Sequence, residues 1–408
     1  MGAPYGAPPG YTAVPMAYYL QDGSVIQPLP ETPGALPAEV MEQEGEQGDY
    51  GQYGDEMEGE GGYGHGHRWP DGSLLGLILP YGEGGLCTPR WFDVRVSAVQ
   101  LARDKASRTV NFASDGIAPL NGDPNVILSS DSLNFDNEYG ARVVVARQIG
   151  PGSNLEFNFL GAFNYSSNAS VSDPNQGLFS VMSDYGRTPA FGFAETDFAT
   201  FQGIAYSSAF NSYELMYRRR WQGRNCRLQG SYLAGVRYMQ LTEDFDYQTR
   251  ANGLPNTLPG NYYMDYSVGT NNSLTGLQIG GDAWVSVIPG LSIGGEVKAG
   301  VYGNHSHQNT TILASSIPDG FTETLRSDDV AFIGELSMMA IYRVNYHWTL
   351  RAGYDFLFID GLALAIENFN SGQPFVDNPV LAPSRVPSYN DNGSLFYHGW
   401  NIGLEYLW

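Results

Sequence analysis

The sequence predicts an all-β protein, an antiparallel up-and-down transmembrane β-barrel of about ten strands that follows a disordered N-terminal extension. Three observations support this prediction. From about residue 91 onward apolar side chains recur at every second position, which is the period of a strand with two different faces. The segments between the strands are alternately short and long. The face opposite the apolar one carries charged residues, whereas a soluble β-sandwich would bury its apolar core there.

The composition excludes two other classes of protein. Charged residues make up only 16% of the chain, against about a quarter in soluble domains, and no apolar run approaches the roughly 18 residues of a membrane helix. The net charge of −22 comes without any basic cluster interleaved with aromatic residues, and an acidic chain repels phosphates. We therefore expect neither a helical membrane protein nor a nucleic-acid-binding protein.

Residues 1–85 form the predicted extension, and residues 86–408 form the predicted barrel. The extension is rich in Pro, Gly, Tyr, Glu and Gln and shows neither hydrophobic period, so too little apolar surface is available to offset the entropy of ordering it. Before Arg68 it contains eleven acidic residues and no basic one. Half of the net charge therefore lies in this extension, which could bind a periplasmic partner.

Two further features of the extension bear on its interpretation. His65 and His67 could bind a metal, but two histidines without further ligands form a weak site, and we expect neither a metal nor a cofactor. No positively charged segment followed by an apolar run opens the chain, so a signal peptide is not visible. This counts against export of the chain as written.

Ten segments have the strand pattern, with ends uncertain by a few residues. They are 91–101, 138–148, 154–166, 206–221, 225–242, 263–288, 291–304, 329–344, 347–362 and 394–408. The segments near 108–113 and 191–205 could each be a strand or part of a loop. The count therefore stays open to eight or twelve.

The connections sort by length. Short turns are expected at 149–153, 222–224, 289–290 and 345–346, where turn-forming residues gather. Long polar loops are expected near 102–137, 167–205, 243–262, 305–328 and 363–393. In an antiparallel barrel this places every short turn and both ends of the barrel at one rim, which is the periplasmic rim in a bacterial outer membrane. The loop 167–205, with its phenylalanines, could fold inward as a plug or stand outward as a contact surface.

The two faces of the strands predict two environments. Apolar residues such as Leu155, Phe157, Phe159 and Phe163 are expected to face lipid. The opposite face would line the lumen with Asp93, Arg95, Arg142, Glu156, Glu214, Arg218, Arg220, Arg227, Arg237, Asp282, Glu296, Lys298, Glu335, Arg343, Arg351, Asp355 and Glu405. Because unpaired buried charges are costly, this nearly balanced set predicts a network of ion pairs.

Two roles for the lumen charges stay open. They could simply support and hydrate the lumen. Alternatively, Arg218, Arg220, Arg227 and Arg237 could line a basic constriction that selects anions. A barrel of about ten strands is only slightly wider than the eight-stranded barrels whose interior side chains fill, so a wide pore is not expected.

The terminal segment Trp400-Asn401-Ile402-Gly403-Leu404-Glu405-Tyr406-Leu407-Trp408 alternates apolar and polar residues and ends on an aromatic. With the strand alternation and the sorted loops, it resembles bacterial outer-membrane β-barrel proteins from about residue 88 onward, especially the Gly/Tyr-rich barrels of planctomycetes. The resemblance implies that Trp400, Ile402, Leu404, Tyr406 and Trp408 form the signal that the barrel-assembly machinery reads. It also implies the lipid bilayer as a partner, and it brings no known catalytic residues.

Cysteine and histidine positions suggest two further hypotheses. Cys87 and Cys226 are both expected at the periplasmic rim, a compartment that permits disulfides, so they could form a bridge or stay as two thiols. His305 and His307 lie at the loop end of a strand, and Glu243, Asp244, Asp246, Asp328 and Asp329 are expected near the same rim. A histidine with a carboxylate could activate water there, but loops are rich in such residues, and we do not expect an enzyme.

The sequence therefore predicts an integral barrel of the bacterial outer membrane with large surface loops and a structural or surface role in the cell envelope. A narrow passive channel for small solutes is the first alternative. An outer-membrane hydrolase and a secreted β-sandwich adhesin are further alternatives. The sequence discloses no oligomeric state.

Overall fold

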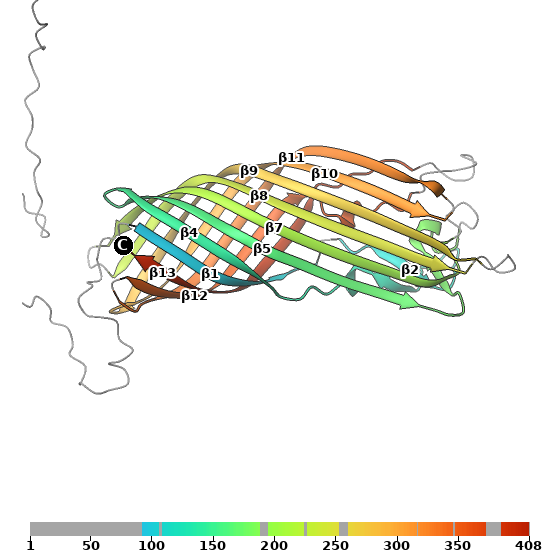
Figure 1. Cartoon of the computed structure of the whole chain (residues 1–408), viewed down its shortest axis with the longest axis horizontal. Coiled ribbons are helices and arrows are strands. Elements are labelled where there is room, and N and C mark those ends of the chain that lie inside the picture. Colours follow the sequence, from blue (N-terminus) through green and yellow to red (C-terminus); the bar gives the residue numbers. More distant parts are fainter. Residues whose placement is uncertain are drawn as a thin grey trace, which may run out of the picture. The chain divides into compact units, whose positions relative to one another are not determined.

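The computed structural model describes residues 92–105, 108–187, 195–223, 227–252, 260–315, 317–345, 347–372 and 385–407. Ten long antiparallel strands form a ring (Figure 1). They are β1 (Phe92–Arg103), β4 (Glu138–Gly150), β5 (Ser153–Ser172), β7 (Ala199–Gln222), β8 (Leu228–Ala251), β9 (Tyr262–Ile288), β10 (Leu291–Ala314), β11 (Ile317–Arg343), β12 (Trp348–Leu362) and β13 (Gly393–Leu407). The predicted fold class is confirmed, and each expected strand has its counterpart in the ring.

The first and last strands of the ring pair with each other and close it. Arg95 of β1 lies opposite Glu405 of β13, and the remaining neighbours pair antiparallel around the ring through the β7–β8 pairing. At the levels where all ten strands run side by side, closure leaves no unpaired strand edge, which is the condition for a sheet to span a bilayer. Among the described residues, no helix is long and apolar enough to cross a membrane.

The strands are longer than the sequence pattern suggested, and two predicted loops are wrong. β8 has 24 residues and β9 has 27, so the expected loop 243–262 is strand as far as Ala251. β10 has 24 residues and β11 has 27, and only residues 315–316 separate them, so the expected loop 305–328 is a hairpin. A tilted strand needs only about 9–11 residues to span the hydrocarbon core. The extra length therefore extends the barrel beyond the membrane on the side opposite the short turns.

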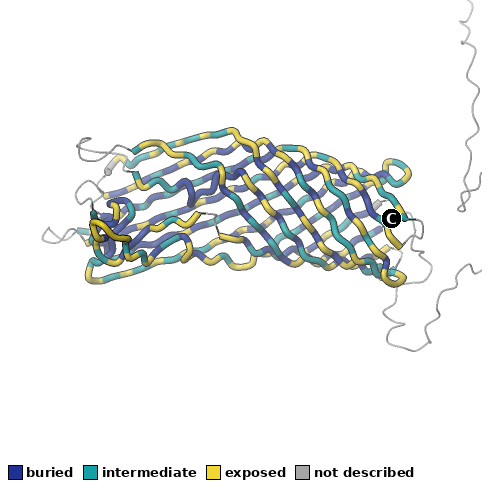
Figure 2. The backbone as a smooth tube through the Cα atoms, turned by 180° about the vertical axis from the view of Figure 1, so that it is seen from behind, coloured by how far each residue is buried: buried dark blue, intermediate teal, exposed yellow. Residues whose placement is uncertain are grey.

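The outer face changes character along these long strands. On β8 the outward residues from Tyr232 to Tyr238 are apolar, and from Gln240 to Arg250 they are polar. The inner face changes in the opposite sense, from Arg237 to buried Phe245 and Tyr247. Figure 2 shows buried and exposed residues alternating along the strands over their whole length. The wall is thus a closed, lipid-facing barrel near the short turns, and beyond it the longer strands form a water-facing wall against an apolar core.

A bulge in β5 overturns one predicted orientation. Leu155 and Phe157 face outward and are 42% and 44% exposed, but Phe163 is buried, with 2% of its surface exposed. The pairing of β5 with β7 shifts between Leu160 and Phe163, where Ala162 has a φ of 69°. The extra residue moves the following side chains to the other face. Phe163 therefore stacks on Phe210 inside the barrel, with 4.8 Å between ring centroids.

Connecting segments fill the far end of the barrel. β2 (Asn111–Asp115), β3 (Val126–Ser129) and β6 (Leu178–Ser180) join the sheet as short strands, with the 3-10 turns η1 (Ser130–Ser132), η2 (Val181–Ser183) and η3 (Ile366–Asn368). Phe112 of β2 packs on Phe245 and Tyr247, with ring centroids 5.1 and 5.4 Å apart. The described parts of 102–137 and 167–205 thus contribute to an inward plug, and the segment near 108–113 is a plug strand rather than a wall strand.

Candidate functional site in the lumen

The inward face of β8 passes every level of the lumen. Starting from the short-turn rim, Ser231 borders a cavity and Arg237 lies in a belt of ion pairs. Met239 and Leu241 belong to a buried apolar layer, and Glu243 lies beyond it as the centre of a second polar cluster. At the level of Phe245 the wall begins to pack against the plug. The lumen is therefore a sequence of layers rather than an open channel.

The belt consists of Arg142, Glu214, Arg237, Lys298, Glu335 and Asp355, which are all buried. Arg237 Nη2 lies 3.0 Å from Glu214 Oε1 and 3.1 Å from Glu335 Oε2. Lys298 Nζ lies 3.0 Å from Glu214 Oε2 and 3.3 Å from Glu335 Oε2. Arg142 lies 2.9 Å from Glu335 and 3.2 Å from Asp355. Three basic and three acidic groups neutralise one another, which offsets much of the cost of removing them from water.

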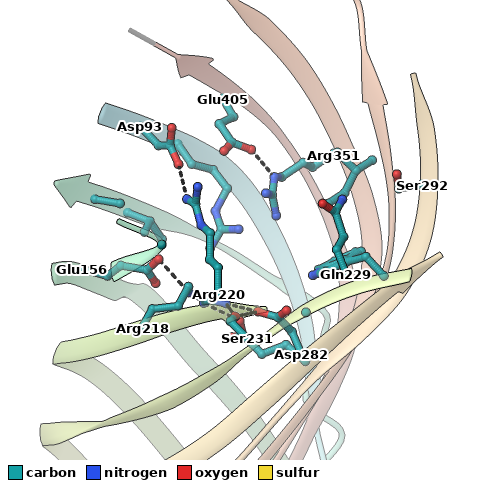
Figure 3. A pocket seen from close by; sticks show the side chains of 18 of the residues that line it. Asp93, Glu156, Arg218, Arg220, Gln229, Ser231, Asp282, Ser292, Arg351 and Glu405 are labelled. Carbon is teal, nitrogen blue, oxygen red and sulfur yellow. Dashed lines mark hydrogen bonds and ion pairs between the residues drawn. The ribbon is translucent and has the colours of Figure 1, made fainter. Parts of the chain in front are cut away.

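A second set of ion pairs lies nearer the short turns (Figure 3). The guanidinium of Arg218 binds three carboxylates: Glu156 at 2.6 Å, Glu296 at 2.7 Å and Asp282. Nearby, Arg220 Nη2 lies 3.2 Å from Asp93 Oδ2. Arg351 Nε pairs with Glu405. These arginines are bound by carboxylates from other strands and tie the wall together across the lumen.

Between these groups and the short-turn rim lies a cavity of about 400 Å³. Its lining includes Arg95 and Arg343 beside the pairs just described, and the aromatic residues Trp221 and Trp284. Arg95 forms no hydrogen bond or ion pair with any residue that the structure describes, and its Nε is buried without a partner. The cavity therefore presents one guanidinium, that of Arg95, without a direct hydrogen-bond or ion-pair partner among the described residues.

Glu243 is the centre of the second polar cluster, beyond the apolar layer. Its carboxylate accepts hydrogen bonds from Arg103 Nη2 at 2.7 Å, Tyr206 Oη at 2.5 Å, Ser208 Oγ at 3.1 Å and the amide of Ala365 at 3.1 Å. The side chains of Arg103 and Glu243 are both 0% exposed. The cluster joins β1, β7 and β8 to the segment that precedes η3. It therefore anchors the plug to the wall.

Wall amides hold the same segment. Asn272 of β9 donates to the carbonyl of Ala363 and accepts from its amide, both at 2.8 Å. Asn304 of β10 donates to the carbonyl of Gly361, at the end of β12 where this segment begins, at 2.9 Å. Both asparagines are buried, so their bonds replace water that the apolar surroundings exclude. The connection after β12 is thereby held inside the barrel.

The structure places the predicted lumen charges as follows. All of them except Arg227 lie at inward positions, in the belt or around the cavity. Arg227 is exposed and precedes β8, so it lies at the rim. Arg218, Arg220 and Arg237, three of the four arginines of the possible basic constriction, are bound by carboxylates. A neutralised guanidinium gives little net attraction for a passing anion.

Sequence reasoning assigned Glu243 to a loop and missed the plug anchors. The signal was present, because alternation continues past residue 242 with Phe245 and Tyr247 on one side and Asp244 and Asp246 on the other. In this part of β8 the outward residues are polar and the inward residues are apolar, the reverse of the membrane part. Because the outward residues are polar, the composition of these positions resembles that of a loop.

The predicted catalytic residues come together only in part. His305 Nδ1 lies 2.6 Å from Asp328 Oδ1, but the side chains are 74% and 79% exposed. His307 is also at an exposed, outward position, whereas Glu243 faces inward. Asp244 and Asp246 face outward on β8, away from Glu243. Among the described residues, no group of three or more His, Cys, Asp or Glu residues is placed to hold a metal ion.

Other predicted positions have simpler outcomes. Trp400, Ile402 and Leu404 face outward and are 65%, 57% and 50% exposed, and Tyr406 lies on the same face. Trp408, Cys87 and Cys226, like His65 and His67, lie outside the described residues. The assembly-signal role of the terminal strand and the proposed disulfide both stay predictions.

One buried acid lies in the plug, outside the membrane part. Asp197 is 8% exposed, and burial raises the pKa of its carboxyl although Ser183 Oγ and the amide of Ser180 donate hydrogen bonds to it. Desolvation disfavours the charged carboxylate more than these two bonds favour it. The folded protein is therefore stabilised by protonation of Asp197.

Comparison with known proteins gives one family. The family described as "Putative beta barrel porin-7 (BBP7)" matches residues 121–408. No curated protein matches the chain. Among solved structures, the outer membrane protease OmpT from Escherichia coli shares 11% identity at a TM-score of 0.42, over 78% of this chain and 96% of that one.

Two further solved structures are similar at lower scores. A major outer membrane protein from Thermus thermophilus shares 11% identity at a TM-score of 0.27, over 77% of this chain and 99% of that one. An outer membrane channel from Pseudomonas putida shares 10% identity at a TM-score of 0.28, over 80% of this chain and 99% of that one. The family match spans most of the barrel.

Proposed function

The chain belongs to the BBP7 family of porin-like barrels in the bacterial outer membrane, and from this premise we propose that it is a closed barrel with a structural role in the cell envelope. The observation that carries the proposal is the filled lumen. The ion-pair belt is followed by an apolar layer in which Met239 and Leu241 are 0% exposed. A hydrated ion would have to lose its water to cross this layer, at a cost of many kcal/mol.

Conductance of the full chain in planar bilayers tests this proposal. We expect no discrete current steps in potassium chloride, while heat-modifiable gel migration shows that the protein is folded. Discrete steps from the folded protein would overturn the closed-barrel proposal. An open porin reconstituted in parallel serves as the positive control.

A narrow passive channel is the second candidate, and two observations favour it. The family is described as a porin family, and the cavity of about 400 Å³ occupies the lumen near the short-turn rim. In this case the plug would have to move. Replacing Asn272 and Asn304 by Leu removes the bonds that hold Ala363 and Gly361, so current steps that appear only in this double variant would favour a gated channel.

We also propose that the barrel is not a hydrolase. The His305–Asp328 pair lies on the exposed outer face, away from the cavity and from Glu243. Incubation of the folded barrel with a fluorogenic peptide library should give no cleavage. Cleavage that is lost in His305→Ala and kept in Arg326→Ala would contradict this proposal.

Three expectations from the sequence stay predictions. They are the likeness to the Gly/Tyr-rich barrels of planctomycetes, the reading of the terminal strand by the assembly machinery, and a periplasmic partner for the acidic extension. Each can be tested separately from the conductance of the barrel.

A further inference from the structure

The cavity near the short-turn rim has the volume and chemistry of a ligand site. Its volume of about 400 Å³ lies within the range of about 300–1,000 Å³ that is typical of pockets for small molecules. The lining combines charged residues with Trp221 and Trp284, whose rings offer apolar contact area. Figure 3 shows the labelled charged side chains converging on this space from several strands.

The cavity lining carries equal numbers of positive and negative side chains, but not every positive side chain forms an ion pair. Five arginines and five carboxylates line the cavity. Arg218 binds Glu156, Asp282 and Glu296. Arg220 and Arg351 bind Asp93 and Glu405. All five carboxylates are thus bound by arginines other than Arg95.

The strand register explains why Arg95 lacks a carboxylate partner. Its cross-strand neighbour is Glu405, which would ordinarily be its partner. Arg351 lies on the other side of β13, opposite Gly403, and its Nε takes the Glu405 carboxylate instead. Arg95 consequently has no hydrogen-bond or ion-pair partner among the described residues, and its Nε is buried.

We propose that Arg95 anchors a small monocarboxylate in this cavity. A guanidinium offers planar donors that match the two oxygens of a carboxylate, and the tryptophans provide contacts for an apolar body. The five carboxylates of the lining disfavour a ligand with two negative charges, such as phosphate, because each added charge is repelled in a partly dry site. This site is independent of whether the barrel conducts.

The ligand that this geometry fits is a free solute, which would enter the cavity from the short-turn rim.

Equilibrium dialysis of radiolabelled benzoate against the folded, detergent-solubilised full chain tests the proposal. Benzamide is the neutral probe of the same shape, and inorganic phosphate is the dianionic one. We expect benzoate to bind at least tenfold more tightly than either. Arg95→Gln should weaken benzoate binding at least tenfold, Arg95→Lys should retain part of it, and Arg326→Gln, an exposed position outside the lumen, should leave it unchanged.

Three results would overturn the proposal: equal binding by Arg95→Gln and the native chain, binding of phosphate or benzamide as tight as that of benzoate, or no benzoate binding by the native chain. Heat-modifiable migration confirms folding of every variant.

Discussion

Replacing Glu243 by Ala should destabilise the barrel more than any other single change in the protruding half. The substitution leaves the fully buried guanidinium of Arg103 without its carboxylate at 2.7 Å, and it removes the acceptor for Tyr206, Ser208 and Ala365. Removing one partner of a buried ion pair costs about 3–5 kcal/mol. Each lost bond to a charged group would add up to about 1.5–3 kcal/mol, but these costs overlap, so we expect a total of about 4 kcal/mol.

Urea unfolding of the barrel in lipid vesicles, followed by tryptophan fluorescence, measures this loss. Asp244→Ala is the matched control, because Asp244 is adjacent in sequence and faces outward; it should change the free energy of unfolding by less than about 0.5 kcal/mol. The double variant Arg103→Met with Glu243→Leu should recover much of the lost free energy of unfolding, because it leaves no unpaired charge buried. A Glu243→Ala barrel as stable as the Asp244→Ala control would refute the assignment of Glu243 as the plug anchor.

Three further outcomes follow from the same structure. Val236→Lys places a charge on the lipid-facing part of β8 and should lower the free energy of unfolding by about 2–4 kcal/mol. Thr242→Lys, on the same face of β8 but beyond the membrane, should lower it by less than about 1 kcal/mol in the same urea titration. Equal losses would contradict the proposed change from lipid to water along the outer face. Asp197→Asn should flatten the pH dependence of the free energy of unfolding. Because the pKa of Asp197 is raised in the folded protein, its contribution to stability is largest below the ordinary carboxyl pKa and is lost as the pH rises through the raised pKa. A native chain that gains stability from this residue between acid and neutral pH would disprove the effect. Asn272→Leu with Asn304→Leu should make the segment around η3 sensitive to added protease while the wall stays intact, and unchanged digestion would show that these amides do not hold it.

The membrane part of the barrel was predictable because one physical rule acts on every residue there. Lipid outside and charges inside give a period of two, as at Tyr232, Val236 and Arg237, and the turns have distinctive residues. Beyond the membrane the same period continues with reversed polarity, so Asp244 and Gln248 resemble loop residues although they lie on a strand. The bulge at Ala162 has no comparable signal, and it reverses Phe163.

The candidate site was predictable in kind but not in pairing. Alternation placed Arg95, Arg218 and Glu405 on the inner face, but which carboxylate binds which arginine depends on the register of neighbouring strands and on side chains that meet across the lumen. Glu405 lies opposite Arg95 in the ladder and yet binds Arg351. A single sequence contains no local signal for that choice.

The continuity of the long strands has a mechanical consequence. The water-facing half stands on the lipid-facing half through the same backbone, since β8 and β9 run without interruption from one to the other. No hinge or flexible linker joins the two along these strands, so their outer part cannot tilt or rotate independently of the bilayer. Whatever meets the far end of the barrel at the cell surface meets an object whose height and orientation are set by the membrane itself.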